Sequence, residues 1–157
     1  MIANLRLITC TTAFALALAA CDTKKTEPAP SPAESNAKLI KEHFQLLNEH
    51  ELKPLIAQYD TKAVIVTSDY PGELHGQPGA DQVFHQTFYV SPDAKYLVGN
   101  TIINDTVAVV EYDVIGLREG HDSPIRYDVR NCSVFKIKDN KIISEATYVN
   151  SKLYNAK

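Results

Sequence analysis

The pattern of apolar and polar residues changes once along the chain, from a helical repeat to an alternation of period two. Apolar residues three and four positions apart predict two helices near 34–48 and 51–59. A β-branched run at 63–67 predicts a short strand, and 79–89 predicts a third helix. From residue 92 the alternation predicts strands at 96–103, 106–118, 125–138 and 141–150, separated by turns or a loop. Helices followed by an antiparallel meander indicate an α+β fold.

The strand at 106–118 is the centre of this pattern, and its two faces differ. One parity carries Glu111 and Asp113 among aliphatic residues, and the other carries Val110, Tyr112 and Val114. Two carboxylates two positions apart on one strand face lie roughly 7 Å apart. If that face lines a cavity, burial and mutual repulsion raise one pKa and produce an acid beside a base. If it faces water, the two are solvated charges or part of a structural ion pair.

The first 33 residues read as a leader and a tether. Residues 1–20 hold a short apolar run, too short to span a bilayer but typical of a signal peptide. The run ends at Cys21 in L-A-A-C, which resembles the bacterial lipobox, so Cys21 is expected to be lipidated; the alternative is an ordinary secretory signal. Asp22 resembles an inner-membrane retention signal. Residues 21–33 are a polar, proline-containing tether, and 34–157 form the domain.

Composition narrows the classes of partner. The formal charge is −3 and no basic stripe occurs, so no nucleic-acid partner is expected. The five histidines do not cluster at metal-ligand spacing, and neither a metal nor a cofactor is expected. Within the domain at 34–157, Cys132 is the one cysteine, and its place within a strand predicts a small buried hydrophobic residue.

The order of elements and several short segments resemble the nuclear transport factor 2-like superfamily, nearest its SnoaL-like branch. The matching segments are L-I-A-Q-Y at 55–59, His75-Gly76, K-D-N-K-I at 138–142 and Y-V-N at 148–150. The resemblance implies a curved antiparallel sheet that forms a cone-shaped cavity, roofed by three N-terminal helices. It also implies a homodimer through the outer sheet face, for which we expect Val110, Tyr112 and Val114 near the centre.

The resemblance also suggests candidate site residues. The proton-shuttling position of ketosteroid isomerases falls on Thr67, with Asp69 two residues later. The position of their protonated carboxylic acid falls on Ser133. The position of their tyrosine falls on His43 or Phe44. For epoxide hydrolases, Asp113 matches one aspartate, but Glu111 and Thr147 replace the remaining arginine and aspartate. None of these catalytic sets is complete. The catalytic candidates are therefore Asp113, Glu111 and Asp69, and the expected ligand-binding residues are His43, Tyr127, Ser133 and Thr147.

Taken together, the sequence predicts a lipid-anchored domain on the periplasmic side of a bacterial envelope. Its cavity is expected to bind a small, largely apolar molecule without turnover. Two alternatives remain open: an isomerase-, cyclase- or hydrolase-type enzyme that uses carboxylates as general acid and base, and a protein-interaction module at the membrane.

Overall fold

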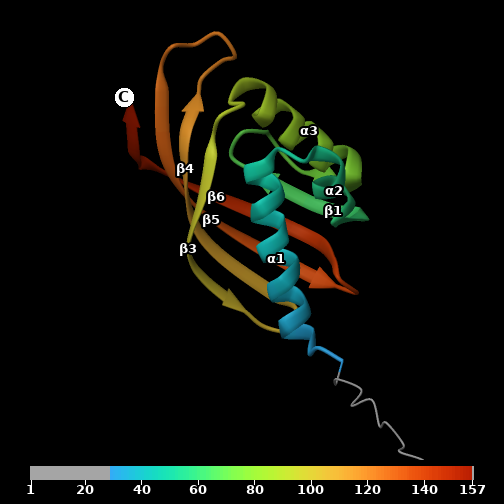
Figure 1. Cartoon of the computed structure of the whole chain (residues 1–157). Coiled ribbons are helices and arrows are strands. Elements are labelled where there is room, and N and C mark those ends of the chain that lie inside the picture. Colours follow the sequence, from blue (N-terminus) through green and yellow to red (C-terminus); the bar gives the residue numbers. More distant parts are fainter. Residues whose placement is uncertain (1–28, 157) are drawn as a thin grey trace, which may run out of the picture.

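The computed structural model describes residues 29–156, with side chains to residue 150, and shows helices packed against one curved sheet (Figure 1). The helices are α1 (Pro32–Glu49), α2 (Leu52–Ala57) and α3 (Gly76–Val90). The strands are β1 (Tyr59–Thr67), β2 (Leu74–His75), β3 (Lys95–Ile103), β4 (Val107–Arg118), β5 (Arg126–Lys138) and β6 (Lys141–Ala156). The predicted α+β fold is confirmed.

The sheet is mixed rather than wholly antiparallel. Its strand order is β2-β1-β6-β5-β4-β3, and β1 runs parallel to β6 while the other neighbours are antiparallel. The chain leaves β1 through β2 and α3 before it enters the meander, so β1 and β6 meet only through tertiary structure. Sequence pattern predicted the meander but not this pairing or the two-residue strand β2.

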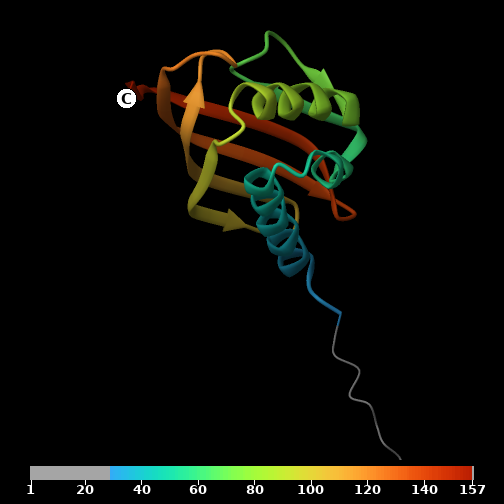
Figure 2. The same ribbon diagram turned by 45° about the horizontal axis from the view of Figure 1, so that its top comes forward.

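Helix α1 begins where the sequence predicts. The Ser31 hydroxyl oxygen accepts from the Glu34 N–H at 3.3 Å, and the Glu34 carboxylate accepts from the Ser31 N–H at 2.7 Å, which completes a capping box. The helix lies across the concave side of the long strands (Figures 1 and 2). Its buried face contains the predicted apolar residues Leu39, Ile40, Phe44 and Leu47.

The two faces of β4 are the reverse of the prediction. Val110, Tyr112 and Val114 are buried at 0%, 7% and 2% exposure and belong to the core. Glu111 and Asp113 therefore lie on the convex face, and the expectation that they line the cavity is wrong. Side chains alternate along a strand, so a comparison with the family that is shifted by one residue assigns every side chain of β4 to the opposite face of the sheet. The same finding removes Val110, Tyr112 and Val114 from any outer-face contact.

A bulge near the end of β4 changes which residues point inward. The register with β5 shifts between Val114 and Leu117, and Gly116 takes a φ of +79° that glycine adopts without steric cost. The Gly116 N–H donates to the Asp128 carboxylate at 3.0 Å. After this bulge Leu117 faces the concave side, although its position in the alternation matches that of Asp113.

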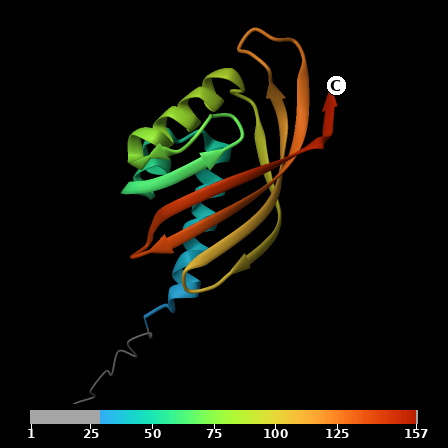
Figure 3. The ribbon, with the colours of Figure 1, turned by 180° about the vertical axis from the view of Figure 1, so that it is seen from behind.

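The convex face of β3–β6 carries no helix in the view from behind (Figure 3). Strand register places one apolar residue from each of five neighbouring strands in a single row across this face. This convex row consists of Ile102, Val109, Val134, Ala146 and Val66. At its two ends Ile102 and Val66 are 66% and 41% exposed, so the row carries large aliphatic side chains in contact with water.

Candidate functional site

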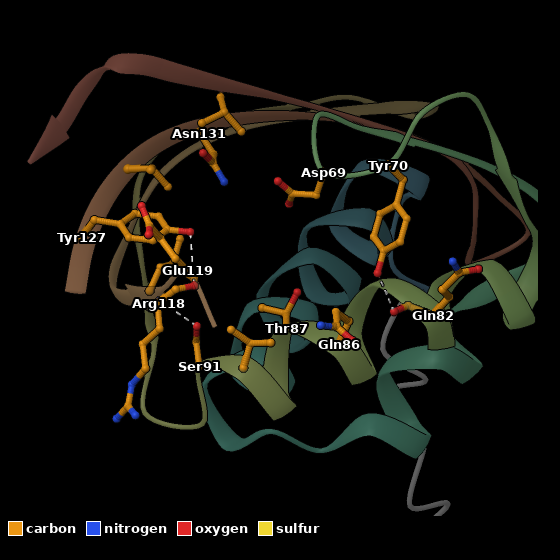
Figure 4. A pocket seen from close by; sticks show the side chains of 14 residues that line it. Asp69, Tyr70, Gln82, Gln86, Thr87, Ser91, Arg118, Glu119, Tyr127 and Asn131 are labelled. Carbon is orange, nitrogen blue, oxygen red and sulfur yellow. Dashed lines mark hydrogen bonds between the residues drawn. The ribbon is translucent and has the colours of Figure 1, made fainter. Parts of the chain in front are cut away.

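A cavity of about 750 Å³ opens between helix α3, the turn after β1, the end of β4 and the start of β5 (Figure 4). Its aliphatic wall is formed by Val90, Leu117, Val129 and Val149. Its polar residues are Asp69, Tyr70, Gln82, Gln86, Thr87, Ser91, Arg118, Glu119, Tyr127 and Asn131. We call this space the outer chamber.

A second space of about 80 Å³ lies deeper, between α1 and the sheet. Asp69, Thr87, Leu117 and Asn131 line both spaces, so they form the neck between the outer chamber and this inner chamber. The inner chamber is walled mainly by aromatic and aliphatic core residues. Its polar residues beyond the neck include His43, Thr67, Tyr96, Tyr112, Glu145 and Thr147.

A chain of side-chain hydrogen bonds runs along the concave face of β4–β6 to Glu145. The Tyr112 and Ser133 hydroxyls are 3.0 Å apart, and the Ser133 and Thr147 hydroxyls are 2.7 Å apart. Thr147 donates to one carboxylate oxygen of Glu145 at 3.1 Å, and Tyr59 donates to the other. The Glu145 carboxyl group, at the end of this series of hydrogen bonds, therefore accepts from one hydroxyl on β1 and one on β6.

Burial controls the electrostatics of this chain. It raises the pKa of Glu145 above its usual 4.5, and the hydrogen bonds from Tyr59 and Thr147 oppose the rise. Burial, assisted by the nearby charge of Glu145, raises the pKa of Tyr112 to about 12. The Tyr112 hydroxyl is therefore neutral at ordinary pH. Because Thr147 donates to Glu145, Ser133 donates to Thr147 and Tyr112 donates to Ser133. The protons of these hydroxyl groups are therefore all directed toward Glu145.

His43 lies on α1 at the inner chamber and is almost fully buried. Its Nδ1 is 2.9 Å from the Gln58 side-chain oxygen, and burial lowers the pKa of His43 to about 4. The histidine is thus neutral at pH 7. Among the residues that the structure describes, no group of three or more His, Cys, Asp or Glu side chains lies close enough to hold a metal ion.

The structure brings five of the predicted site residues to the cavity or its wall. Asp69 lies at the neck, Tyr127 lines the outer chamber, and His43 and Thr147 line the inner chamber. Ser133 is buried behind this chamber in the hydrogen-bonded chain. Glu111 and Asp113 do not reach the cavity, because both lie on the convex face of β4, where Asp113 forms an ion pair with Arg130.

Sequence reasoning missed Glu145, Tyr59, Tyr112 and Asn131. A signal for Glu145 was present, because it precedes Thr147 by two residues and must share its face in a strand. Tyr112 was missed through the register error on β4. No local pattern marks Tyr59, whose hydroxyl meets Glu145 only because β1 pairs with β6.

The rim beside the outer chamber is cross-linked by polar contacts. Asp93, after α3, contacts the guanidinium groups of Arg118 and Arg126. His121 Nδ1 lies 2.7 Å from the Tyr89 carbonyl oxygen, and the two rings stack with centroids 4.4 Å apart. These contacts fix the β4–β5 loop against the end of α3.

Comparison with known proteins agrees with this architecture. The model of the SnoaL-like domain family matches residues 40–145. None of the curated protein sequences matches the chain.

Several solved structures share the fold at low sequence identity. Bal32a, from a soil-derived mobile gene cassette, has a TM-score of 0.67 at 19% identity, covering 80% of this chain and all of that one. SalBIII, an epoxide hydrolase/cyclase-like enzyme in pyran ring formation in salinomycin, has a TM-score of 0.68 at 13% identity, covering 77% and 95%. A protein of ketosteroid isomerase-like fold from Catenulispora acidiphila, solved with trimethylamine, has a TM-score of 0.65 at 9% identity, covering 74% and 88%.

Proposed function

The chain belongs to the SnoaL-like domain family, and from this premise we propose that it binds a small, largely apolar molecule in the outer chamber. The observation that carries the proposal is a cavity of about 750 Å³ with an aliphatic wall and a few convergent polar groups. A protein-interaction module that binds no ligand would not need such a space. Proteins with this fold include the SalBIII enzyme and a protein solved with trimethylamine, so the fold accommodates both catalysis and small-molecule binding.

Binding of the neutral dye Nile red tests this proposal. We expect a saturable rise in fluorescence, because the dye is apolar and of a size that the outer chamber holds. Leu117→Trp fills the neck and should weaken dye binding about tenfold or more. Ile115→Trp is the matched control on the outer face of the same strand and should bind normally. No saturable binding, or equal binding by both variants, would contradict the proposal.

An acid–base enzyme is the second candidate, supported by the position of Asp69. Its carboxylate lies at the neck, next to the inner chamber, which is also lined by Tyr96, a phenol that stays neutral because burial raises its pKa. A carboxylate facing a hydrogen-bond donor across a bound molecule is the usual arrangement for proton transfer. Chemical conversion of a bound ligand by the wild type but not by Asp69→Asn would favour turnover over binding alone.

We also propose attachment to a membrane through lipidated Cys21, on the periplasmic side of the envelope, with Asp22 favouring the inner membrane. The support is the leader sequence, which lies outside the described residues. None of the helices within residues 29–156 is long and apolar enough to cross a membrane.

A homodimer through the outer sheet face remains part of the proposal, with a different centre. The convex row of Ile102, Val109, Val134, Ala146 and Val66 replaces the residues first expected there. A second copy packed on this row would bury apolar side chains that are otherwise exposed to water.

A further inference from the structure

The carboxylates around the two chambers outnumber the cationic groups. Three carboxylates line them, at Asp69, Glu119 and Glu145, whereas Arg118 is the only arginine or lysine among the lining residues. The Arg118 guanidinium contacts Asp93 and the His121 carbonyl oxygen, and it points away from the chamber (Figure 4). His43 is neutral because burial lowers its pKa to about 4. An anionic ligand would therefore meet negative charge without a compensating cation.

Asp69 is the carboxylate best placed to meet a ligand. Glu145 is occupied by Tyr59 and Thr147, and Glu119 has interactions of its own. Among the described residues, the Asp69 carboxylate has neither a hydrogen bond nor an ion pair, and only its backbone N–H is bonded, to the Thr67 hydroxyl.

The opposite wall of the neck is formed by Asn131. The side chains of Asp69 and Asn131 point toward each other across the space (Figure 4). The Asn131 side-chain oxygen is buried and has no hydrogen-bond partner among the described residues. The Asp69 carboxylate can only accept, and it faces Asn131 across the neck, so a ligand held there would donate a hydrogen bond to Asp69.

We propose that the ligand is an apolar molecule with a protonated amine, held at the neck with Asp69 as its counterion. This inference rests on the proposed ligand-binding function and specifies its chemical class. The apolar body would pack against Val90, Val129 and Val149 in the outer chamber, and the ammonium group would donate to the Asp69 carboxylate. A carboxylate or phosphate ester is disfavoured, because it would approach Asp69 and Glu119 while the Arg118 guanidinium points away from the chamber.

The tyrosine below the neck experiences the same negative potential. Burial raises the pKa of Tyr96 most, and the charges of Asp69 and Glu145 raise it further. A cation at the neck would relieve this negative potential at Tyr96.

Three probes of equal chain length test the ligand class by isothermal titration calorimetry with the purified full chain: decylamine, decanol and decanoate. We expect decylamine to bind on the order of tenfold more tightly than decanol, and not more than that, because Asp69 is exposed and water and salt screen its attraction for the ammonium group. Decanoate should bind most weakly. Asp69→Asn should abolish the preference for decylamine while leaving decanol affinity within about twofold. Asp81→Asn, an exposed carboxylate on α3, is the matched control and should retain the preference.

The outcomes separate this inference from the proposed function. Equal binding of decylamine and decanol, unchanged by Asp69→Asn, would overturn the amine assignment and leave an apolar binding site in place. Tightest binding of decanoate would overturn it as well. Failure of all three probes to bind would contradict the proposed function itself and the inference with it.

Discussion

Asp113 and Arg130 face each other across β4 and β5 on the convex side of the sheet. Arg130 Nε donates to one Asp113 oxygen at 2.7 Å, and a terminal nitrogen donates to the other at 2.9 Å. The pair is bidentate but open to water, with side chains 39% and 59% exposed. The hydrogen bonds from Arg130 lower the pKa of Asp113 below its usual 3.8.

The first prediction is that Asp113→Asn leaves the cavity unaffected. Exposed ion pairs contribute little to stability, so the melting temperature at pH 7 should fall by no more than about 3 °C. Because the pKa of Asp113 is lowered in the folded state, this small contribution is present above pH 3.8 and disappears as the pH falls below it. Thermal melts and Nile red titrations measure both effects. A loss of dye binding would show that Asp113 acts on the cavity after all.

The second prediction concerns Glu145. Since its pKa is raised in the folded state, its contribution to stability is complete below pH 4.5 and is lost as the pH rises through the folded-state pKa. Glu145→Gln removes this loss, and the Tyr59 and Thr147 hydroxyls can rotate to suit the amide. The variant should therefore gain a few degrees in melting temperature relative to wild type between pH 4 and pH 8.

Glu42→Gln, an exposed change on α1, serves as the control and should follow the wild-type melts. If the Glu145→Gln and wild-type melting temperatures stay parallel from pH 4 to pH 8, folding does not raise the pKa of Glu145.

The third prediction concerns His43, for which the sign is opposite. Its pKa falls from 6.5 to about 4 on folding, so its contribution is present above pH 6.5 and is lost between pH 6.5 and pH 4. At about 1.4 kcal/mol for each pKa unit, the loss is roughly 3 kcal/mol. His43→Gln should show a smaller fall in unfolding free energy over this range. Urea titrations at several pH values measure it, with the exposed His85→Gln as control; equal slopes for the two variants would rule the effect out.

The fourth prediction is that a charge in the convex row prevents dimerisation. Val109 lies within the row, and Val109→Lys would place an ammonium group at the proposed contact. Sedimentation equilibrium at tens of micromolar should give a dimer for wild type and a monomer for this variant. Ala37→Lys, at an exposed position on α1, should remain dimeric. A monomeric wild type would refute the contact outright.

The fifth prediction concerns the anchor. Expressed in a bacterial host with a radioactive fatty acid, the wild type should incorporate label, and Cys21→Ser should not, because serine has no thiol to acylate. Cys132→Ser should keep the label, since Cys132 lies in β5 within the folded domain. Undiminished labelling of Cys21→Ser would exclude lipidation at this residue.

Local physical chemistry explains what the sequence determined by itself. The capping residues Ser31 and Glu34, the helical spacing of Leu39 to Leu47 and the turn at Asp139-Asn140 each depend on neighbours in the chain, and all are found as predicted. Positive φ angles at Asp139 and Asn140 are those that a tight hairpin turn requires. Pattern and residue order were sufficient for the α+β class and for the long strands.

Only the tertiary structure decided which face of each strand meets the cavity. Alternation states that Tyr112 and Asp113 point in opposite directions, but not which of them points inward, because both faces of β4 carry aliphatic residues. The answer depends on α1 packing against Tyr112, and the bulge at Gly116 then turns Leu117 inward. Likewise, Tyr59 meets Glu145 through the parallel pairing of β1 with β6, a contact between residues 86 positions apart that no local pattern encodes.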